Sequence, residues 1–255
     1  MPKQKKALLF KAISIRTILP SVVTLFAFMS GLTAIRFALA GKWELSVAAI
    51  LMAGIFDGLD GTVARLLKST SRFGAELDSL SDVVAFGVAP AVVLYLWILQ
   101  ELDRLGWAVA LIYAIAMALR LARFNAKLDD DEEPRQRAGF LTGVPAPMGA
   151  GLMLVPMMLD FGVGGGVVQT NSLLVVPYVV VVALLMVSTI PTFSLKALRV
   201  PREWFVPVML VIGSIIAGLF VQTWFVLLGI ALLYLISLPI SFWAHRRRRA
   251  HKRRS

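Results

Sequence analysis

Residues 57–82 read DGLDGTVARLLKSTSRFGAELDSLSD, and two strongly apolar regions of the chain contribute their aspartates to this segment: Asp57, Asp60, Asp78 and Asp82. The apolar regions predict membrane-spanning helices, where one aspartate costs on the order of 2.5–3.5 kcal/mol on insertion scales. Four such residues need a compensating partner. A purely structural alternative pairs them with Arg65, Arg120 and Arg123, but desolvation offsets most of the attraction in buried ion pairs. We therefore interpret the four aspartates as a functional site.

The spacing of the aspartates predicts that they converge. Asp57 and Asp60 are three residues apart, and Asp78 and Asp82 are four apart, so each pair occupies one face of its helix. The segment between the pairs is expected to turn at the membrane surface. If the two helices pack as an antiparallel hairpin, both pairs lie at matched depths and face each other.

Four convergent carboxylates repel one another unless cations neutralise them. Ligation by oxygen alone suits a hard divalent ion such as Mg²⁺, Mn²⁺ or Ca²⁺. Two such ions a few ångströms apart would clamp a phosphate and its leaving oxygen during an in-line displacement. Gly58, Gly61, Ala64, Gly74 and Ala75 leave room for a ligand beside the backbone, although small residues also serve ordinary helix packing in membranes.

Composition places the chain in a membrane. Of its 255 residues, 58% are hydrophobic and only 16% are charged, and the mean hydropathy is +0.80. The absence of cysteine excludes disulfides, thiolate metal sites and cysteine nucleophiles. We expect an all-α integral membrane protein with about eight spanning helices, near residues 17–38, 43–66, 77–99, 105–124, 141–161, 172–191, 203–221 and 223–243.

Charge distribution predicts the orientation. With a cytoplasmic N-terminus, 23 of the 26 Lys and Arg residues fall inside, and only Arg36, Lys42 and Arg104 fall outside. The chain then divides into a basic cytoplasmic segment (1–16), a polytopic catalytic domain (17–243) and a basic cytoplasmic tail (244–255). The tail could be taken for an RNA-binding arm, but its position directly after an apolar helix favours a lipid-facing anchor and no nucleic-acid partner. We expect both termini and the active site on the cytoplasmic side, in a bacterial inner membrane.

The segment 57–82 resembles the signature of the CDP-alcohol phosphotransferase family, D-x-x-D-G-x-x-A-R, eight residues, G-x-x-x-D-x-x-x-D, at every signature position. Three further segments resemble the phosphatidylserine synthase branch of that family: FGAELDSLSDVVAFGVAPA at 73–91, ALRLARFN at 118–125 and GVPAP at 143–147. Helix 1 departs from the pattern, because Ser21 and Ala27 stand where relatives often carry asparagine.

The resemblance implies a six-helix core, usually dimeric, that transfers the phosphatidyl group of CDP-diacylglycerol to the hydroxyl of L-serine and releases CMP and phosphatidylserine. It implies a divalent metal, expected here as two ions, with four ligands or neighbours: Asp57, Asp60, Asp78 and Asp82. Asp82 matches the proposed general base. The residues matching the CDP-diacylglycerol site are Asp57, Gly61, Ala64, Arg65 and Gly74.

The acceptor site is expected at the end of the fourth span. The serine carboxylate needs a cation, and Arg120 and Arg123 lie three residues apart with Asn125 following. Positive-inside anchoring is the alternative for both arginines. Three other functions remain open: transfer to another acceptor such as glycerol 3-phosphate or inositol phosphate, cation-coupled transport, and a membrane scaffold.

Overall fold

The computed structural model describes residues 15–67, 71–126, 140–164, 166–188, 191–193 and 201–252, and it is almost entirely helical. The helices are α1 (Ile15–Leu39), α2 (Trp43–Leu67), α3 (Arg72–Asp82), the π-helix η1 (Val83–Val88), α4 (Ala89–Trp97), α5 (Asp103–Ala126), α7 (Ala146–Met153), α8 (Val155–Val163), α9 (Ser172–Val187), α10 (Phe205–Val221) and α11 (Thr223–Lys252), with 3₁₀ turns η2 (Leu99–Leu102), η3 (Gln169–Asn171) and η5 (Arg202–Trp204). The expected all-α class is confirmed.

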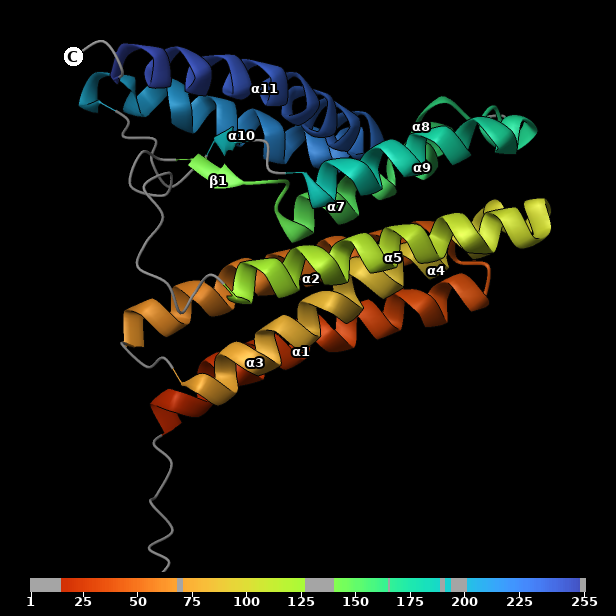
Figure 1. Ribbon diagram of the computed structural model, residues 1–255, viewed down its shortest axis with the longest axis horizontal. Coiled ribbons are helices and arrows are strands. Elements are labelled where there is room, and N and C mark those ends of the chain that lie inside the picture. The colour runs from red at the N-terminus through yellow and green to blue at the C-terminus, as the bar shows by residue number, and fades with distance from the viewer. Residues whose placement is uncertain are drawn as a thin grey trace, which may run out of the picture.

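The helices form two layers (Figure 1). Helices α1 to α5 make one layer, and α7 to α11 make the other. Helix α1 packs along α2 and also against α3, while α5 contacts α9 across the layers. The start of α1 and the end of α11 lie at the same end of the molecule, which agrees with termini on one side of a membrane.

The expected count of eight spanning helices is not confirmed. Within the described ranges, six helical segments are long and apolar enough to cross a bilayer, and the bent pair α7–α8 raises the number to seven if it counts as one span. Helix α10 has 17 residues, so it rises about 26 Å and is shorter than a typical hydrocarbon core. Helix α11 continues to Lys252, beyond the expected end of the membrane domain at residue 243.

The third span is one long helical segment, Arg72–Trp97, with a π-helical turn directly after Asp82. Close packing holds this turn: a Cβ on Gly31 of α1 would lie 2.7 Å from Cα of Ala85. On the other side, the buried Tyr113 hydroxyl of α5 donates to the carbonyl of Phe86 at 2.9 Å. Such turns often occur at functional sites, and this one fixes where Asp82 lies relative to α5.

A short β-pairing closes the end of the molecule where α1 begins. Strand β1 (Phe140–Thr142) pairs antiparallel with β2 (Pro191–Phe193), with Phe140 opposite Phe193. Gly143 follows β1 with φ of +78°, and a Cβ there would lie 2.9 Å from the Ser188 carbonyl oxygen. This pairing was not anticipated, because three-residue strands leave no periodic signal in the sequence.

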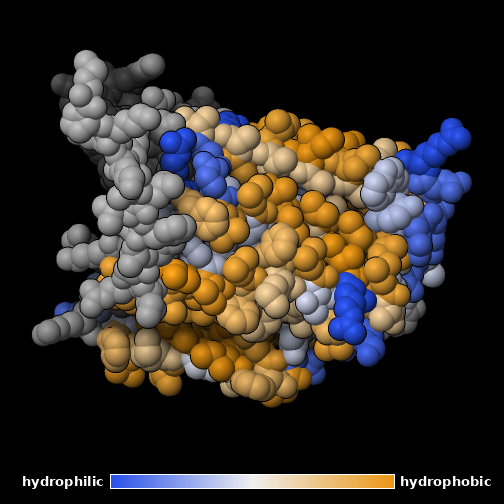
Figure 2. All heavy atoms as spheres, turned by 90° about the horizontal axis from the view of Figure 1, so that it is seen from below, coloured by the Kyte–Doolittle hydropathy of each residue, from blue (hydrophilic) through white to orange (hydrophobic). Residues whose placement is uncertain are grey.

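Apolar side chains cover the middle of the molecule. Figure 2 shows a broad hydrophobic belt with hydrophilic residues gathered at the right-hand end. On α1, Met29 is 57% exposed, whereas Ala34 on the inner side of the same helix is fully buried. A surface of this kind would be insoluble in water, so the belt is suited to lipid.

Candidate active site

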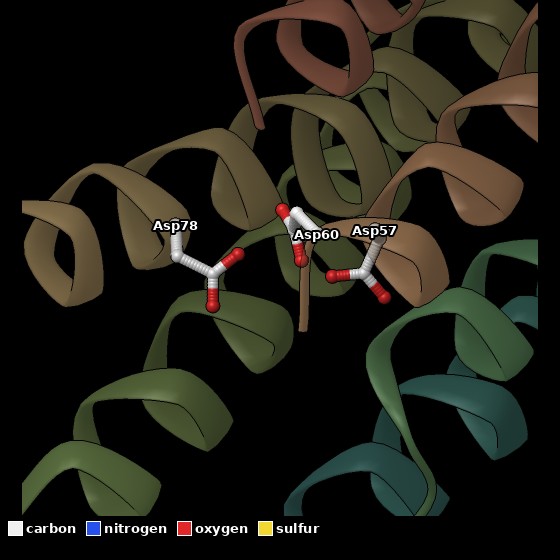
Figure 3. Close-up of side chains that lie close together, drawn as sticks. All are labelled: Asp57, Asp60 and Asp78. Carbon is white, nitrogen blue, oxygen red and sulfur yellow. The ribbon is translucent and has the colours of Figure 1, made fainter. Parts of the chain in front are cut away.

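Three of the four expected aspartates meet in space. One carboxylate oxygen from each of Asp57, Asp60 and Asp78 lies within 4.8 Å of the other two. Figure 3 shows the carboxylates directed into the same space, Asp57 and Asp60 from α2 and Asp78 from α3. An all-oxygen donor set of this size fits one hard divalent cation, so the residues present suit the expected ion.

The two spans that carry the aspartates pack against each other. Helix α3 itself makes few direct contacts with α2, but η1 and α4, which continue the same span, both contact α2. Helices α2 and α3 also both pack against α1. The aspartates therefore meet beside α1, as expected if the two spans pack together.

Asp60 is the most enclosed of the three ligands. It is 6% exposed, and its Oδ2 accepts a hydrogen bond of 2.7 Å from the Thr24 hydroxyl of α1. Thr24 is itself 4% exposed. Sequence reasoning missed Thr24, although a signal was present: Ser21 and Thr24 are polar residues three apart in the apolar first half of the helix, which predicts that they share one face.

Asp82 lies next to the cluster and outside its three-residue core. It is the last residue of α3, one turn beyond Asp78. Its carboxylate is within hydrogen-bonding range of Asp57 and interacts electrostatically with Asp78 and with Arg120 of α5. Asp82 is thus placed between the aspartate cluster and the expected acceptor residues.

A cavity of about 150 Å³ opens beside the cluster. Helices α1, α2 and α3 and the turn before α3 all contribute to its lining: Pro20, Ser21, Thr24, Asp60, Gly61, Ala64, Ser71, Gly74, Ala75 and Asp78. Four of the five expected small residues line the cavity, and Gly58 does not: the four are Gly61, Ala64, Gly74 and Ala75. Their lack of bulk leaves space in the cavity. Arg65 is not among the residues that line the cavity: its Nη2 donates to Oγ1 of Thr62 at 3.1 Å, and its Nη1 would lie 3.9 Å from a Cβ on Gly61.

The start of α3 faces this cavity. Ser71 caps the helix, with its Oγ accepting from the backbone N–H of Gly74 at 2.9 Å. Ser71, Gly74 and Ala75 all line the cavity. A helix N-terminus carries a partial positive charge and free N–H groups, so this wall favours an anionic group such as a phosphate.

Of the expected acceptor residues, Arg120 and Arg123 contact the second layer, whereas Asn125 bonds within the first. Arg120 donates from Nε to the carbonyl of Val144, just before α7. Arg123 donates to the last carbonyls of α9, at 2.7 Å to Val187 and 3.2 Å to Ser188. Asn125 donates to Oγ of Ser79 at 2.9 Å. These contacts place all three residues near the end of the molecule that holds the aspartates.

Sequence comparison identifies the family. A profile described as CDP-alcohol phosphatidyltransferase matches residues 17–190, and a second, described as CDP-alcohol phosphatidyltransferase 2, matches residues 203–239. The chain belongs to the CDP-alcohol phosphatidyltransferase family. The first match covers the family signature and all helices from α1 to α9, which confirms the resemblance noted in the sequence.

Relatives within the CDP-alcohol phosphatidyltransferase family share one name. The chain is 39% identical over 236 residues to the CDP-diacylglycerol–serine O-phosphatidyltransferase of Mycobacterium leprae, covering 92% of this chain and 77% of the relative. It is 38% identical over 231 residues to the Mycobacterium tuberculosis protein of that name, covering 90% and 79%. The Helicobacter pylori protein of that name is 32% identical over 196 residues, covering 77% and 80%.

The cluster geometry predicts the effect of removing single ligands. Asp57→Asn, Asp60→Asn and Asp78→Asn each replace an anionic oxygen pair by a neutral amide of the same size, so each variant of this family member should lose tight Mn²⁺ binding in detergent. The free Mn²⁺ signal in electron paramagnetic resonance measures the binding.

Asp160→Asn is the matched control for these variants. Asp160 is also a buried aspartate in an apolar helix, but its Oδ1 accepts from the Val168 N–H at 3.0 Å, away from the cluster. This control should bind Mn²⁺ as the wild type does. Wild-type affinity in all three cluster variants would refute the metal site.

Proposed function

We propose that the protein transfers the phosphatidyl group of CDP-diacylglycerol to the hydroxyl of L-serine, with CMP and phosphatidylserine as products. The observation that carries this proposal is the convergence of Asp57, Asp60 and Asp78 beside a cavity bordered by a helix N-terminus. The relatives that cover about 90% of the chain bear the name of this activity. A membrane-embedded phosphatidyl transfer requires both the aspartate cluster and the cavity beside it.

The cytidine diphosphate part of the lipid substrate is assigned to the cavity. Gly61, Ala64 and Gly74 leave space against the backbone, so a nucleotide can lie close to α2 and α3. The N-terminal amides of α3 and the guanidinium of Arg65 offer positive charge to the diphosphate. Asp57 is also assigned to the CDP-diacylglycerol site, which it would contact through the proposed metal ion. Diacylglycerol chains can remain in the lipid, because the exposed apolar side chains of α1 and α2 face outward.

The divalent ion is assigned to Asp57, Asp60 and Asp78, with Asp82 adjacent. We propose two ions, Mg²⁺ or Mn²⁺ with Ca²⁺ as a further candidate, as the signature implies. A bound ion of this kind supplies charge neutralisation to the diphosphate oxygens. The ion would also stabilise the three carboxylates, because it offsets the repulsion between oxygens that lie within 4.8 Å of one another.

Asp82 is assigned as the general base. In the proposed step, the serine hydroxyl oxygen forms a bond to the phosphorus of the phosphatidyl group, and the phosphorus–oxygen bond to CMP breaks. The hydroxyl proton passes to the Asp82 carboxylate. Its place beside Asp57 and facing Arg120 supports this role, because a base must lie between the acceptor and the phosphorus.

The serine carboxylate is assigned to the arginines of α5, with Arg120 the better placed. Arg120 donates a hydrogen bond from Nε to the Val144 carbonyl, which leaves its terminal nitrogens for other partners. It also interacts electrostatically with Asp82, the proposed base. Arg123 directs both Nη atoms toward α9, and Asn125 binds Ser79. In this proposal Arg123 and Asn125 shape the pocket around Arg120 in addition to any direct contact with serine.

The site is assigned to the cytoplasmic side of a bacterial inner membrane, in a homodimer. The cavity draws on the start of α1 and the start of α3, at the end of the molecule where α11 also ends. The predominance of Lys and Arg in the segments at this end supports that orientation. Serine, CMP and Mg²⁺ are water-soluble, so an opening toward an aqueous compartment is required.

The reaction can be tested with the purified protein, CDP-diacylglycerol, Mn²⁺ or Mg²⁺ and a panel of acceptors. CMP release should require L-serine and a divalent ion, and phosphatidylserine should form in equal amount. Release with glycerol 3-phosphate or inositol phosphate but not serine would assign a different acceptor. Ion uptake by sealed vesicles without CMP release would indicate a transporter instead.

Replacement of the proposed base separates chemistry from binding. Asp82→Asn should lower kcat by roughly 10²–10⁴-fold, the usual effect of losing a general base, while binding of CDP-diacylglycerol stays within a few-fold of wild type. Steady-state CMP release and equilibrium binding of the lipid give the two quantities. A parallel collapse of affinity and turnover would assign Asp82 to metal or substrate binding.

Acceptor recognition is tested by Arg120→Lys. Lysine keeps the charge but loses the planar fork that matches a carboxylate, so the KM for serine should rise about tenfold or more, equivalent to about 1.4 kcal/mol. The KM for CDP-diacylglycerol should change little. Arg123→Lys should raise the serine KM less, and Arg36→Lys, at the far end of α1, should leave it unchanged. Unchanged serine kinetics in both α5 variants would assign these arginines to topology alone.

A further inference from the structure

Thr24 joins three helices at the aspartate cluster. Its hydroxyl, on α1, donates to Oδ2 of Asp60 on α2 at 2.7 Å, and it lies 3.2 Å from the carbonyl oxygen of Pro20 in the preceding turn. Its backbone carbonyl accepts a hydrogen bond of 3.2 Å from Oγ of Ser81 on α3. Ser81 is 2% exposed, Thr24 4% and Asp60 6%, so all three residues are almost completely buried where the helices meet.

The contact selects one orientation of the Asp60 carboxylate. With Oδ2 engaged by a buried hydroxyl, rotation of the carboxylate would break a charge-assisted hydrogen bond. The remaining lone pairs of Asp60 are then available to the space shared with Asp57 and Asp78. Thr24 also lines the cavity itself, so α1 contributes to the site through this residue.

We propose that Thr24 is a positioning residue, which holds Asp60 in the orientation that ligates the divalent ion. The inference rests on the proposed metal site and deepens it, since it assigns to α1 a role in metal affinity. Partners of this kind typically change metal affinity by roughly 10–100-fold when they are removed. The effect arises because an unsupported ligand must be ordered at the moment the ion binds.

A purely structural role for Thr24 makes a different prediction. If its bond to Asp60 only ties α1 to α2, its loss lowers thermal stability and leaves the intrinsic affinity of the folded protein for Mn²⁺ unchanged. A positioning role lowers that affinity in protein that is still folded. The two roles therefore separate on a direct binding measurement made with the metal alone.

The test compares Thr24→Val with Thr24→Ser in detergent-solubilised, monodisperse full-length protein. Valine has nearly the shape of threonine but no hydroxyl, whereas serine retains the donor. Thr33→Val is the matched control, because Thr33 lies on the same helix and its hydroxyl bonds the Met29 carbonyl at 2.7 Å in the same backbone pattern, away from the cluster. Titration with Mn²⁺ alone, followed by electron paramagnetic resonance, gives the Kd.

We expect Thr24→Val to raise the Kd for Mn²⁺ at least tenfold, with Thr24→Ser and Thr33→Val within about twofold of wild type. Should Thr24→Val not yield monodisperse protein, Thr24→Ala removes the hydroxyl without placing a methyl group against the carboxylate, and the same shift is expected. Wild-type affinity in a folded variant without the hydroxyl, or a Thr24→Ser protein as weak as Thr24→Val, overturns the inference. Failure of the wild type to bind Mn²⁺ overturns the proposed metal site and this inference with it.

Discussion

Carboxylates inside apolar helices repel one another and lose hydration, and the packing around Asp57, Asp60 and Asp78 is arranged to hold them together nevertheless. Their oxygens lie within 4.8 Å of one another, where unneutralised charges would destabilise the fold. The fold brings α1 against the two helices that carry them and engages Asp60 through Thr24. The proposed cation would offset this repulsion, because all three carboxylates would be attracted to it. Under this proposal, the local fold and the chemistry depend on the same ion.

Close backbone approach makes this arrangement possible. Gly31 brings α1 against Ala85 in the π-helical turn, and Gly87 brings the same turn against Met117 of α5. The Tyr113 hydroxyl then holds the Phe86 carbonyl. Since Asp82 lies one residue before this turn, the packing sets its distance to Arg120 as well as to Asp78. A larger side chain at Gly31 would move Asp82 relative to Asp78 and Arg120.

Local spacing was sufficient to predict part of the site. The separations of three and four residues correctly predicted that aspartates of α2 and α3 converge, and the small residues Gly61 and Gly74 both line the cavity beside them. The all-α class also followed from composition and apolar periodicity. These features depend on neighbours in sequence, which helical geometry relates directly.

Features that depend on distant parts of the chain were missed. Thr24 contacts Asp60 across 36 residues, and neither residue alone indicates the pairing. The bend between α7 and α8 and the shortness of α10 changed the span count, since apolar windows measure hydrophobicity but not where a helix breaks. The π-helical turn after Asp82 depends on packing against α1 and α5, so its residues carry no local signal of their own.

The division of the site between the layers bears on how acceptor choice can vary within the family. The aspartates, the cavity and the N-terminal end of α3 all belong to α1, α2 and α3, and α2 and α3 carry the family signature. Arg120 and Arg123 instead connect α5 to Val144 before α7 and to the end of α9. Under the proposed function, a change in α7 or α9 would therefore alter the proposed acceptor pocket while Asp57, Asp60 and Asp78 stay in place. For this reason the aspartate cluster supports the reaction class, whereas the assignment of serine depends on α5 and its contacts across the layers.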